Sequence, residues 1–397
     1  MHRHLSSPRK VRKTQLPLNT NMNQQDSIHL ARALELAERG RGFVEPNPMV
    51  GCVIADAEGV IAEGFHERCG QNHAERNAIA AIPSGASDRL SGATLYVTLE
   101  PCCHHGKTPP CTEAVLASGV GRVVVGMQDP FEKVSGGGIK QLRDAGLEVE
   151  VLSSGELHDS IRRLNAPFIK RVTHELPWVI AKWAMSLDGK IATRTGDSQW
   201  ISGPESRRAV HVLRSQVDAI IVGRKTADVD DPLLTPRGVA STGRTLVRVV
   251  VDSLAQLSLT SQLVVTATEC PTVVWAGPDA AADRVSALKS RGVVVQQSST
   301  ADRNARLAEL LRWLVAQYTA TNVLVEGGGE LLGSLLTQKL IDQCEIFVGP
   351  KLIGGAAAQS PVAGLGFEQL AQSPATVCTS VRQLGTDAHI RCQLQWA

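Results

Sequence analysis

The chain has 397 residues, too many for one typical domain, so two domains of ordinary size are expected. A net charge of +2, with 43% hydrophobic and 20% charged residues, is typical of a globular protein and gives no electrostatic reason to expect binding to nucleic acid or to an anionic membrane. No apolar run reaches the roughly 18 residues of a membrane span. Nine cysteines without a secretory signal favour reduced thiols, and hence the cytoplasm, over disulfides.

Residues 1–21 form a basic extension that contains five lysine and arginine residues and no acidic residue. Together with the serine, proline and asparagine content, this composition predicts disorder. A short targeting or nucleic-acid-binding arm is the alternative, but the segment lacks an amphipathic repeat and an apolar centre. The extension is also consistent with an upstream start codon and Met22 as the natural first residue.

Beyond residue 21, helix and strand patterns alternate. Asp26 or Ser27 can cap a first helix with apolar residues on one face, and Gly40 can end it. Two strands are predicted at 49–56 and 60–64. Further helices are predicted at 74–82, 111–118 and 138–145, and further strands at 93–99, 122–126 and 147–152. This order predicts a layered α/β domain over residues 22–152.

The chemistry of this domain is predicted from His73, Cys102 and Cys111. One neutral imidazole and two thiolates leave the fourth position of a tetrahedral Zn²⁺ open, as a catalytic zinc requires. Glu75 lies two residues after His73, so if His73 opens a helix, the carboxylate can reach the activated water and carry protons to a leaving amine. Cys103 is an alternative ligand, but it is turned away if Cys102 begins a helical turn. The pattern indicates hydrolytic deamination.

Three further polar residues are candidates for holding the substrate. Asn47 precedes the first strand, where its amide could read the edge of a pyrimidine or simply form an Asn-Pro turn. His104 and Lys107 lie between the two cysteines. They are candidates for contacting a substrate phosphate or a pyrimidine carbonyl, with a solvated lysine as the alternative.

Residues 100–111, Glu-Pro-Cys-Cys-His-His-Gly-Lys-Thr-Pro-Pro-Cys, resemble the matching loop of the bifunctional riboflavin-biosynthesis deaminase/reductase family. The long spacer between the cysteines distinguishes this loop from that of cytidine and tRNA-adenosine deaminases. The resemblance implies the substrate 2,5-diamino-6-ribosylamino-4(3H)-pyrimidinone 5′-phosphate. The chain departs from the family after residue 128: Asn-Pro followed by Val-Ala-Gly-Lys-Gly is usual there, whereas Asp129-Pro130-Phe131-Glu132 and, at 134–138, Val-Ser-Gly-Gly-Gly occur here. The resemblance therefore implies that this chain lacks one polar substrate contact of the family.

Residues 153–176 are predicted to connect this domain to a second one, with a polar stretch, a helix at 157–170 and a break at Pro177. The segment 178–192 resembles the start of the reductase half of the same family. The resemblance continues at 198–202, 218–223, 230–237 and 252–253. It implies that residues 177–397 form a dihydrofolate-reductase-like domain that uses NADPH.

The resemblance also implies individual contacts in this second domain. NADPH contacts are expected at Ala184, Trp200, Thr226, Asp230, Ser253, Gly328, Gly329, Glu330, Leu331, Leu332, Gly333 and Ser334. Substrate contacts are expected at Ser198, Arg214, Leu234, Arg237 and Glu326. Physical chemistry supports the arginines, because a planar guanidinium suits bidentate binding of phosphate.

Glycines follow the apolar strand 322–325 and precede a helix predicted at 330–338. Such a turn lets the backbone approach a pyrophosphate at the helix N-terminus, although the spacing is not that of a Rossmann fingerprint. A glycine-rich turn without a ligand is the alternative. No single arginine can be assigned to a 2′-phosphate, so the choice of NADPH over NADH follows only from the resemblance.

The complete prediction is a two-step enzyme with Zn²⁺ and NADPH as cofactors. The first domain deaminates the pyrimidinone with Glu75 as proton carrier, and the second reduces the ribosyl side chain to give 5-amino-6-(5-phosphoribitylamino)uracil. Lys182 is expected to polarise or protonate the reacting ribose, with an ion pair lining the cleft as the alternative. A small phosphorylated pyrimidine is the expected partner, without nucleic acid or membrane, in a homo-oligomer of two or more chains.

Two other functions remain open at the level of sequence. One is a nucleoside or nucleobase zinc deaminase with an inactive reductase-like domain, which the long cysteine spacer and the lack of a basic, aromatic-lined strand disfavour. The other is a binding module with a structural zinc, for which Cys103, His104 or His105 would have to supply a fourth ligand. Ammonia release from the pyrimidinone phosphate would separate these functions.

Overall fold

The computed structural model describes residues 22–105, 109–131 and 135–396. The extension predicted to be disordered, residues 1–21, lies outside the described residues, as do Lys107 and Glu132. Within the described ranges, no helix is both long and apolar enough to cross a membrane.

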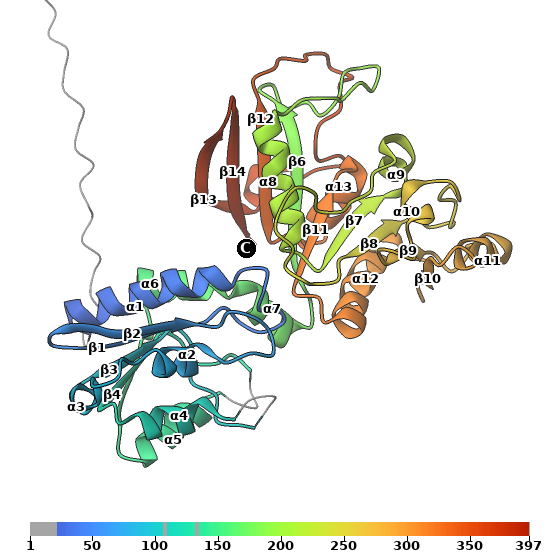
Figure 1. Ribbon diagram of the computed structural model, residues 1–397. Coiled ribbons are helices and arrows are strands. Elements are labelled where there is room, and N and C mark those ends of the chain that lie inside the picture. Colours follow the sequence, from blue (N-terminus) through green and yellow to red (C-terminus); the bar gives the residue numbers. More distant parts are fainter. Residues whose placement is uncertain (1–21, 106–108, 132–134, 397) are drawn as a thin grey trace, which may run out of the picture. The chain divides into compact units, whose positions relative to one another are not determined.

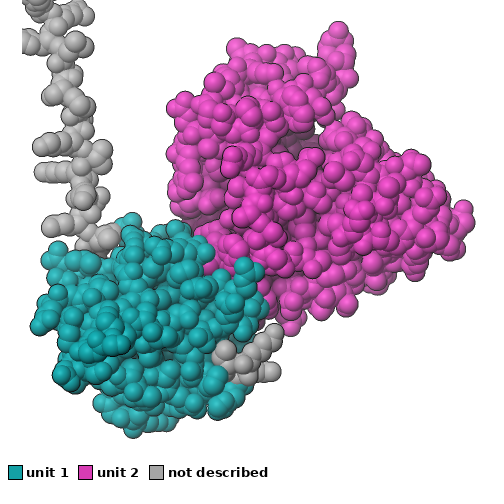
Figure 2. Space-filling view, viewed as in Figure 1, with its two compact units in different colours: residues 1–39, 49–164 teal, residues 40–48, 165–397 magenta. Residues whose placement is uncertain are grey.

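The chain folds as two compact units, which are coloured separately in Figure 2. The first unit contains the residues up to Arg39 and Met49–Leu164, and the second contains Gly40–Pro48 and Asn165–Ala397. The short segment 40–48, which lies inside the domain expected at 22–152, therefore packs with the second unit. A 3₁₀ helix, Glu38–Gly40, spans the point where the chain first changes unit.

The first unit is a single sheet covered by helices. Its strands are β1 (Gly51–Asp56), β2 (Gly59–Phe65), β3 (Thr94–Val97), β4 (Arg122–Val125) and β5 (Glu148–Val151). Its helices are α1 (Gln24–Ala37), α2 (Ala74–Ala80), α3 (Ser87–Leu90), α4 (Cys111–Ser118), α5 (Gly137–Asp144) and α6 (Glu156–Leu164). The strand order is β2-β1-β3-β4-β5, with β3, β4 and β5 parallel. Figure 1 shows α1 and α6 on one face and α2, α4 and α5 on the other, so the predicted layered α/β fold is confirmed.

The helix α1 begins earlier than predicted, because its N-cap is Asn23, three residues before Asp26. Asn23 Oδ1 accepts a hydrogen bond from the Asp26 N–H at 2.8 Å, and the Asp26 carboxylate accepts one from the Asn23 N–H at 3.2 Å. Asp26 is also fully buried, where it accepts hydrogen bonds from Tyr96 Oη at 3.0 Å and from Arg122 at 2.8 and 2.9 Å. This carboxylate ties α1 to β3 and β4.

Two glycines allow helices to lie close against the sheet. A Cβ at Gly51 would lie 1.9 Å from the Ala33 carbonyl oxygen in α1, and a Cβ at Gly64 would lie 2.3 Å from the Ala78 nitrogen in α2. Neither position has room for a side chain. The second contact holds α2 against β2 and so fixes the position of His73, which is the N-cap residue of α2.

The second unit is built on a larger sheet. Its strands are β6 (Trp178–Ser186), β7 (Ala219–Gly223), β8 (Val247–Val251), β9 (Thr272–Ala276), β10 (Val294–Gln297), β11 (Asn322–Glu326), β12 (Gln343–Gly349), β13 (Ala375–Leu384) and β14 (Asp387–Gln395). Its helices are α7 (Ala166–His174), α8 (Pro204–Ser215), α9 (Arg224–Asp230), α10 (Gln262–Val265), α11 (Ala282–Lys289), α12 (Arg303–Tyr318), α13 (Gly329–Thr337) and the 3₁₀ turn η2 (Leu370–Gln372).

Among the described residues the strand order of this sheet is β10-β9-β8-β7-β11-β6-β12-β14-β13. The strands from β10 to β12 are parallel, and β14 and β13 extend the sheet in antiparallel fashion. Parallel strands bring their carboxyl ends to one edge, which is where open α/β sheets bind ligands.

Apolar cores fill both faces of the large sheet. Ile221 of β7 belongs to the core that includes α12 and α13, whereas its neighbour Ile220 belongs to the core that includes α10 and α11. Val249 and Val250 of β8 divide in the same way. Successive strand residues point to opposite faces, so a central parallel strand is apolar at every position.

The connecting segment contains two helices where one was predicted at 157–170. The helix α6 ends at Leu164, and α7 begins at Ala166 with Pro167 in its first turn. Proline lacks the N–H that a continuous helix would need at this position and is tolerated in a first turn. The boundary between the two units falls at this break.

Candidate functional site

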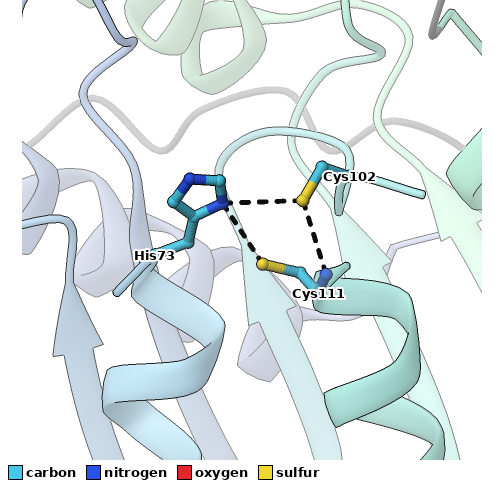
Figure 3. A group of neighbouring side chains, drawn as sticks. All are labelled: His73, Cys102 and Cys111. Atoms are coloured by element: carbon cyan, nitrogen blue, oxygen red, sulfur yellow. Dashed lines mark hydrogen bonds between the residues drawn. The ribbon is translucent and has the colours of Figure 1, made fainter. Parts of the chain in front are cut away.

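Three side chains with metal-binding atoms converge in the first unit (Figure 3). His73 precedes α2, Cys111 is the first residue of α4, and Cys102 lies in the loop after β3. His73 Nδ1 is 3.5 Å from Cys102 Sγ and 3.3 Å from Cys111 Sγ, and all three ligand atoms lie within 4.8 Å of one another. Over the described ranges this is the one such cluster of His, Cys, Asp and Glu. The donor set fits Zn²⁺ with one tetrahedral position left for water.

Hydrogen bonds to Cys102 Sγ favour the thiolate, which is the form that binds a metal cation. The Cys111 N–H, at the start of α4, donates a hydrogen bond to Cys102 Sγ at 3.4 Å. The side-chain hydrogen bond from Cys111 lowers the pKa of the Cys102 thiol to about 4 and raises the pKa of the Cys111 thiol above its ordinary value. Because Zn²⁺ binds thiolates, metal binding here would release the protons that the two thiols still carry.

The neighbouring residues proposed as a fourth ligand point elsewhere. The Cys103 thiol lies against Gly137, where an added Cβ would come within 3.0 Å of the sulfur. His105 Nε2 lies 3.5 Å from Glu113 Oε1, and His104 is exposed. None of them belongs to the ligand cluster. The arrangement therefore favours an open metal site over a closed structural one.

Glu75, the second residue of α2, is only 3% exposed. Burial raises the pKa of its carboxyl to about 7, against the opposing effects of its own backbone N–H and of His73. The carboxyl interacts with the Cys111 thiol and lies close to buried Cys52 on β1. A carboxyl in contact with the Cys111 thiol, with a pKa near neutrality, can both accept and donate a proton.

Glu100 is a positioning residue that the sequence analysis did not single out. Its carboxylate accepts four backbone hydrogen bonds of 2.9 to 3.2 Å, from the N–H groups of Asp129, Gly136, Gly138 and Ile139. A Cβ at Gly138 would lie 2.0 Å from the Pro101 carbonyl oxygen. These contacts clamp the Cys102 loop to the start of α5, and the adjacency of Glu100 to Pro101-Cys102 was the only sequence signal for them.

The substrate contacts expected in this unit are placed only in part. Asn47 lies in the segment 40–48, which groups with the second unit. His104 is exposed and contributes to the electrostatic environment of Asp129, whose carboxyl has a pKa raised by burial. Lys107 lies outside the described residues. These three contacts stay predictions.

The second unit contains a cavity of about 1310 Å³ at the carboxyl edge of its parallel strands. It is lined by most of the residues expected to contact the cofactor: Ala184, Trp200, Thr226, Asp230, Ser253, Gly328, Gly329, Glu330, Leu331 and Ser334. It is also lined by Lys182 and by three of the residues expected to contact the substrate: Ser198, Arg214 and Arg237. Segments that are far apart in the sequence thus meet around one space large enough for a dinucleotide and a second ligand.

Four expected contact residues do not line the cavity. Leu332 of α13 is 1% exposed and packs in the core that includes α12. A Cβ at Gly333 would lie 1.9 Å from the Ala363 carbonyl oxygen. Leu234 is 2% exposed in the opposite core, at a φ of 54°. Leu332, Gly333 and Leu234 therefore contribute to packing and present no side chain to the cavity. The fourth, Glu326, is 8% exposed at the end of β11.

Glu326 is the centre of a buried charge network. Arg214 donates two hydrogen bonds to its carboxylate at 2.6 and 2.9 Å, and Lys182 Nζ lies 3.8 Å away. Burial opposes the charge of Glu326, but Arg214 and Lys182 hold its pKa below the ordinary value. Burial lowers the pKa of Lys182, an effect that Glu326 only partly offsets. Lys182 is thus a cation at the cavity wall that loses its proton more readily than an ordinary lysine.

Two turns between strand and helix form a cradle at the cavity. Gly327 and Gly328 follow β11 with φ values of 77° and 83°, which only glycine adopts readily. A Cβ at Gly328 would lie 3.4 Å from Thr226 Oγ1 and 3.9 Å from the Gly223 nitrogen, so the turns after β11 and β7 lie against each other. Each turn leads into a helix, α13 or α9, and paired helix N-termini favour a pyrophosphate. This cradle fits NADPH.

Further basic residues, which the sequence analysis did not assign, also line the cavity. In α8, Arg207 and His211 lie seven and three residues before the expected contact Arg214, so the three side chains face the cavity together. The Arg207 guanidinium lies 4.7 Å from the centre of the Trp200 ring. The helical spacing of these basic residues was a usable signal for this group. Arg303 and Arg306 of α12 line another part of the wall.

The chain matches two protein-family models. Residues 23–127 match the cytidine and deoxycytidylate deaminase zinc-binding region, and residues 177–390 match the RibD C-terminal domain. The first match contains all three ligands of the metal cluster, and the second contains every residue named around the cavity.

Curated relatives match nearly the whole chain. The riboflavin biosynthesis protein RibD of Actinobacillus pleuropneumoniae is 38% identical over 94% of this chain and 96% of its own length. The protein of that name from Escherichia coli K12 is 36% identical over 91% of this chain and 98% of its own length.

Solved structures resemble both units together. Acinetobacter baumannii RibD, form 1, has a TM-score of 0.78 and 35% identity, and covers 94% of this chain and 99% of its own. A diaminohydroxyphosphoribosylaminopyrimidine deaminase/5-amino-6-(5-phosphoribosylamino)uracil reductase from Thermotoga maritima has a TM-score of 0.76 and 33% identity, and covers 93% of this chain and 98% of its own.

Proposed function

Because the chain belongs to the RibD family of bifunctional riboflavin-biosynthesis enzymes, we propose that its first unit deaminates 2,5-diamino-6-ribosylamino-4(3H)-pyrimidinone 5′-phosphate and its second unit reduces the product. The chain is a zinc-dependent deaminase and an NADPH-dependent reductase. The Thermotoga maritima relative carries both activities in its name. The observation that carries the proposal is the presence of two intact sites, a His-Cys-Cys cluster and a glycine-turn cavity, in one chain.

In the deaminase site, His73, Cys102 and Cys111 would hold Zn²⁺, which when bound makes water a stronger acid and nucleophile at neutral pH. Glu75 takes a proton from the attacking water and gives it to the leaving amine at C2 of the pyrimidinone. The buried position of Glu75 next to Cys111 supports this role. Glu100 holds the Cys102 loop in place through its four backbone contacts. Asn47, His104 and Lys107 are proposed to contact the substrate.

In the reductase site, bound NADPH supplies a hydride to C1 of the ribose. Lys182, which lies on β6 within the cavity wall, is proposed to polarise or protonate the reacting ribose. Glu326, 3.8 Å from Lys182 Nζ, favours the protonated form of Lys182, and Arg214 holds the Glu326 carboxylate with two hydrogen bonds. Arg214 and Arg237 are the proposed phosphate-binding residues, Ser198 is a further substrate contact, and Leu234 contributes through its backbone. At the turn after β11 and the start of α13, the proposed cofactor contacts are Gly328, Gly329, Glu330, Leu331 and Ser334.

The domains are proposed to act as a deaminase domain at 22–152 and a reductase domain at 177–397, joined by 153–176. The cytoplasm is the proposed location, because the free cysteines of the described residues are typical of a reducing compartment.

A paired assay tests the proposal. Purified, zinc-loaded protein is given the diaminopyrimidinone ribosyl phosphate and NADPH, and ammonia and NADPH absorbance are followed in the same sample. Ammonia should appear first and NADPH should then be consumed. Ammonia without NADPH oxidation would indicate a deaminase with an inactive second unit, and a folded protein that gives neither signal would exclude the substrate.

A homo-oligomer is proposed because β13 is an edge strand exposed on both faces. Val377 and Val381 are 39% and 67% exposed on it. An edge with unpaired backbone groups and exposed valines is suited to pairing with a second copy. Sedimentation velocity should show a species of at least two chains that Val381→Arg weakens. A monomer at all micromolar concentrations would contradict the proposal.

A further inference from the structure

NADPH differs from NADH only in the 2′-phosphate on its adenosine ribose, so selectivity must arise where the adenosine binds. The cradle of Thr226 and Gly328 lies at the ends of β7 and β11, and Lys182 marks the reduction end on β6. In the strand order, β8 and β9 lie on the other side of β7. If the pyrophosphate occupies the cradle, as in the proposed function, the adenosine lies over β8 and β9, roughly 5 to 10 Å away at normal strand spacing.

Four cationic side chains line the cavity at or beyond the cradle: Arg224, Lys225, Arg303 and Arg306. Arg224 is already compensated, because its Nη1 lies 2.7 Å from Asp228 and its Nε lies 3.7 Å from Asp252. Arg306 is only 8% exposed. Over the described residues it forms no ion pair within 4.0 Å, although Glu309, three residues later in α12, interacts with it electrostatically at longer range. Its guanidinium donates instead to the carbonyl oxygens of Thr300 at 2.8 Å and Ala301 at 2.9 Å.

A buried cation that no contacting carboxylate compensates is costly. Glu309, whose carboxylate accepts hydrogen bonds from Ser298 and Ser299, interacts with Arg306 only at longer range, so a bound anion would stabilise Arg306 further. Nη1 makes no hydrogen bond to the described part of the protein, so the guanidinium keeps donor capacity for a ligand. The partner that the cofactor offers at this end is a phosphate, whose geometry suits a guanidinium.

The position of Arg306 is built into the loops around it. A Cβ at Gly277 would lie 2.6 Å from Nη1 and 2.9 Å from Cζ of Arg306, so the guanidinium rests directly on this glycine after β9. The Gly277 N–H donates to the Ser253 carbonyl oxygen at 2.9 Å. Arg306 is thereby placed beside the loop after β8, where Ser253 is an expected cofactor contact. Arg303, exposed on the first turn of α12, lies one turn before it on the same wall.

We propose that Arg306, assisted by Arg303, binds the 2′-phosphate of NADPH and determines the preference for NADPH over NADH. This inference rests on the proposed function, because it takes the cavity to be the NADPH site. Gly277 is then a positioning residue, required so that the Arg306 guanidinium can lie flat between the two loops.

The test compares adenosine 2′,5′-bisphosphate with 5′-AMP, which lacks only the 2′-phosphate, by calorimetry on the full-length protein. Arg306→Met should raise the Kd of the bisphosphate about 10- to 100-fold, the usual effect of losing a hydrogen bond to a charged group, and change the Kd of 5′-AMP less than about twofold. The ratio of kcat/KM for NADPH to that for NADH should fall by the same factor. Arg306→Lys should recover part of the loss.

Two further variants separate charge from packing. Gly277→Ala keeps every charge but displaces the guanidinium, and it should lower the preference for the bisphosphate in the same direction. Arg284→Met is the matched control, because Arg284 also donates to two carbonyl groups, those of Ala255 and Leu257, but does not line the cavity. It should leave the ratio unchanged.

Retained NADH turnover in Arg306→Met shows that the variant folds. An equal loss for both nucleotides, or an unchanged bisphosphate Kd, overturns the assignment and leaves Arg306 as a packing residue. A wild-type protein that binds neither NADPH nor the bisphosphate instead refutes the proposed cofactor site itself, and the inference with it.

Discussion

Glu75, which is 3% exposed, and Lys182, whose side chain is 18% exposed, both have pKa values that shift towards neutrality, from opposite directions. Burial disfavours the charged form of each, so it raises the pKa of the carboxyl and lowers that of the ammonium. A carboxyl with a pKa of about 7 exchanges protons readily near neutral pH, and an ammonium with a lowered pKa gives up its proton more readily than an exposed lysine does. Glu75 and Lys182 are therefore candidates for acid-base chemistry in their respective units.

Replacing the Glu75 carboxyl with an amide should abolish deamination while keeping the shape of the site. In Glu75→Gln we expect ammonia release to fall about 10²- to 10⁴-fold, because the amide cannot carry the proton. Zinc content, measured by atomic absorption, should stay at the wild-type level, since Glu75 is not a ligand. NADPH oxidation with the deaminated intermediate should also be unchanged. Full deaminase turnover in this variant would exclude Glu75 as the proton carrier.

Removal of the Lys182 amine should affect only the reduction. In Lys182→Met, kcat for the deaminated intermediate should fall about 10²-fold or more, while Arg214 keeps Glu326 paired and the unit folded. In the wild type, kcat should decline as pH rises through the lowered pKa of Lys182, below the ordinary 10.5, because the neutral amine cannot donate. Lys289→Met, at an exposed site on α11, is the control. Unchanged turnover in Lys182→Met would remove the proposed role.

At the scale of elements, the start of α1 depends on the buried Asp26 carboxylate. Burial opposes its charge, but the hydrogen bonds from Arg122 and Tyr96 outweigh this effect and hold its pKa below the ordinary 3.8. A carboxyl whose pKa is depressed by folding stabilises the folded state above its unfolded pKa. That contribution is lost as pH falls through the folded pKa. The helix cap and the sheet contact therefore share one acid-sensitive group.

Asp26→Asn should destabilise the first unit by about 2 kcal/mol at neutral pH, because charged hydrogen bonds are lost while Arg122 keeps Glu150 as a partner at 2.7 Å. Hydrogen exchange of peptides from α1, β3 and β4 should report faster opening in the variant. The difference from wild type should shrink below pH of about 4. Asp144→Asn, which breaks only an exposed pair with Lys140, should change little. A constant difference down to pH 2 would contradict this linkage.

At the scale of the whole molecule, each unit has its own sheet, its own core and its own site. The metal cluster lies wholly within the first unit, and the residues that line the cavity lie wholly within the second. The same division appears in the two family matches. The two half-reactions should therefore be separable without cutting the chain.

Removing zinc with dipicolinate should abolish ammonia release and leave NADPH oxidation of the deaminated intermediate within about twofold of the untreated rate. Zinc binding energy contributes to the folding of its site, so the first unit alone should become less protected from hydrogen exchange. Added Zn²⁺ should restore ammonia release. Parallel loss of both activities on chelation would show that the second unit depends on the first.

The sequence by itself determined the chemistry of the metal site, because ligand type and spacing are local properties. His73, Cys102 and Cys111 could be named from the motif, and α4 could be bounded correctly from residue patterns. The apolar strands and the glycine turn after β11 were also visible, since strand burial and left-handed backbone leave direct marks on composition. The resemblance of these segments to a known family supplied the substrate.

Only the tertiary structure decided which side chains face a site and which face a core. Leu234 and Leu332 match expected contacts in sequence, yet their side chains are buried in packing, because their direction depends on strands and helices far away in the chain. The four backbone N–H groups that donate to Glu100 come from residues about 30 to 40 positions later. The contact of the Arg306 guanidinium with Gly277 joins α12 to the end of β9. Such contacts arise when distant segments pack together, so no local sequence pattern predicts them.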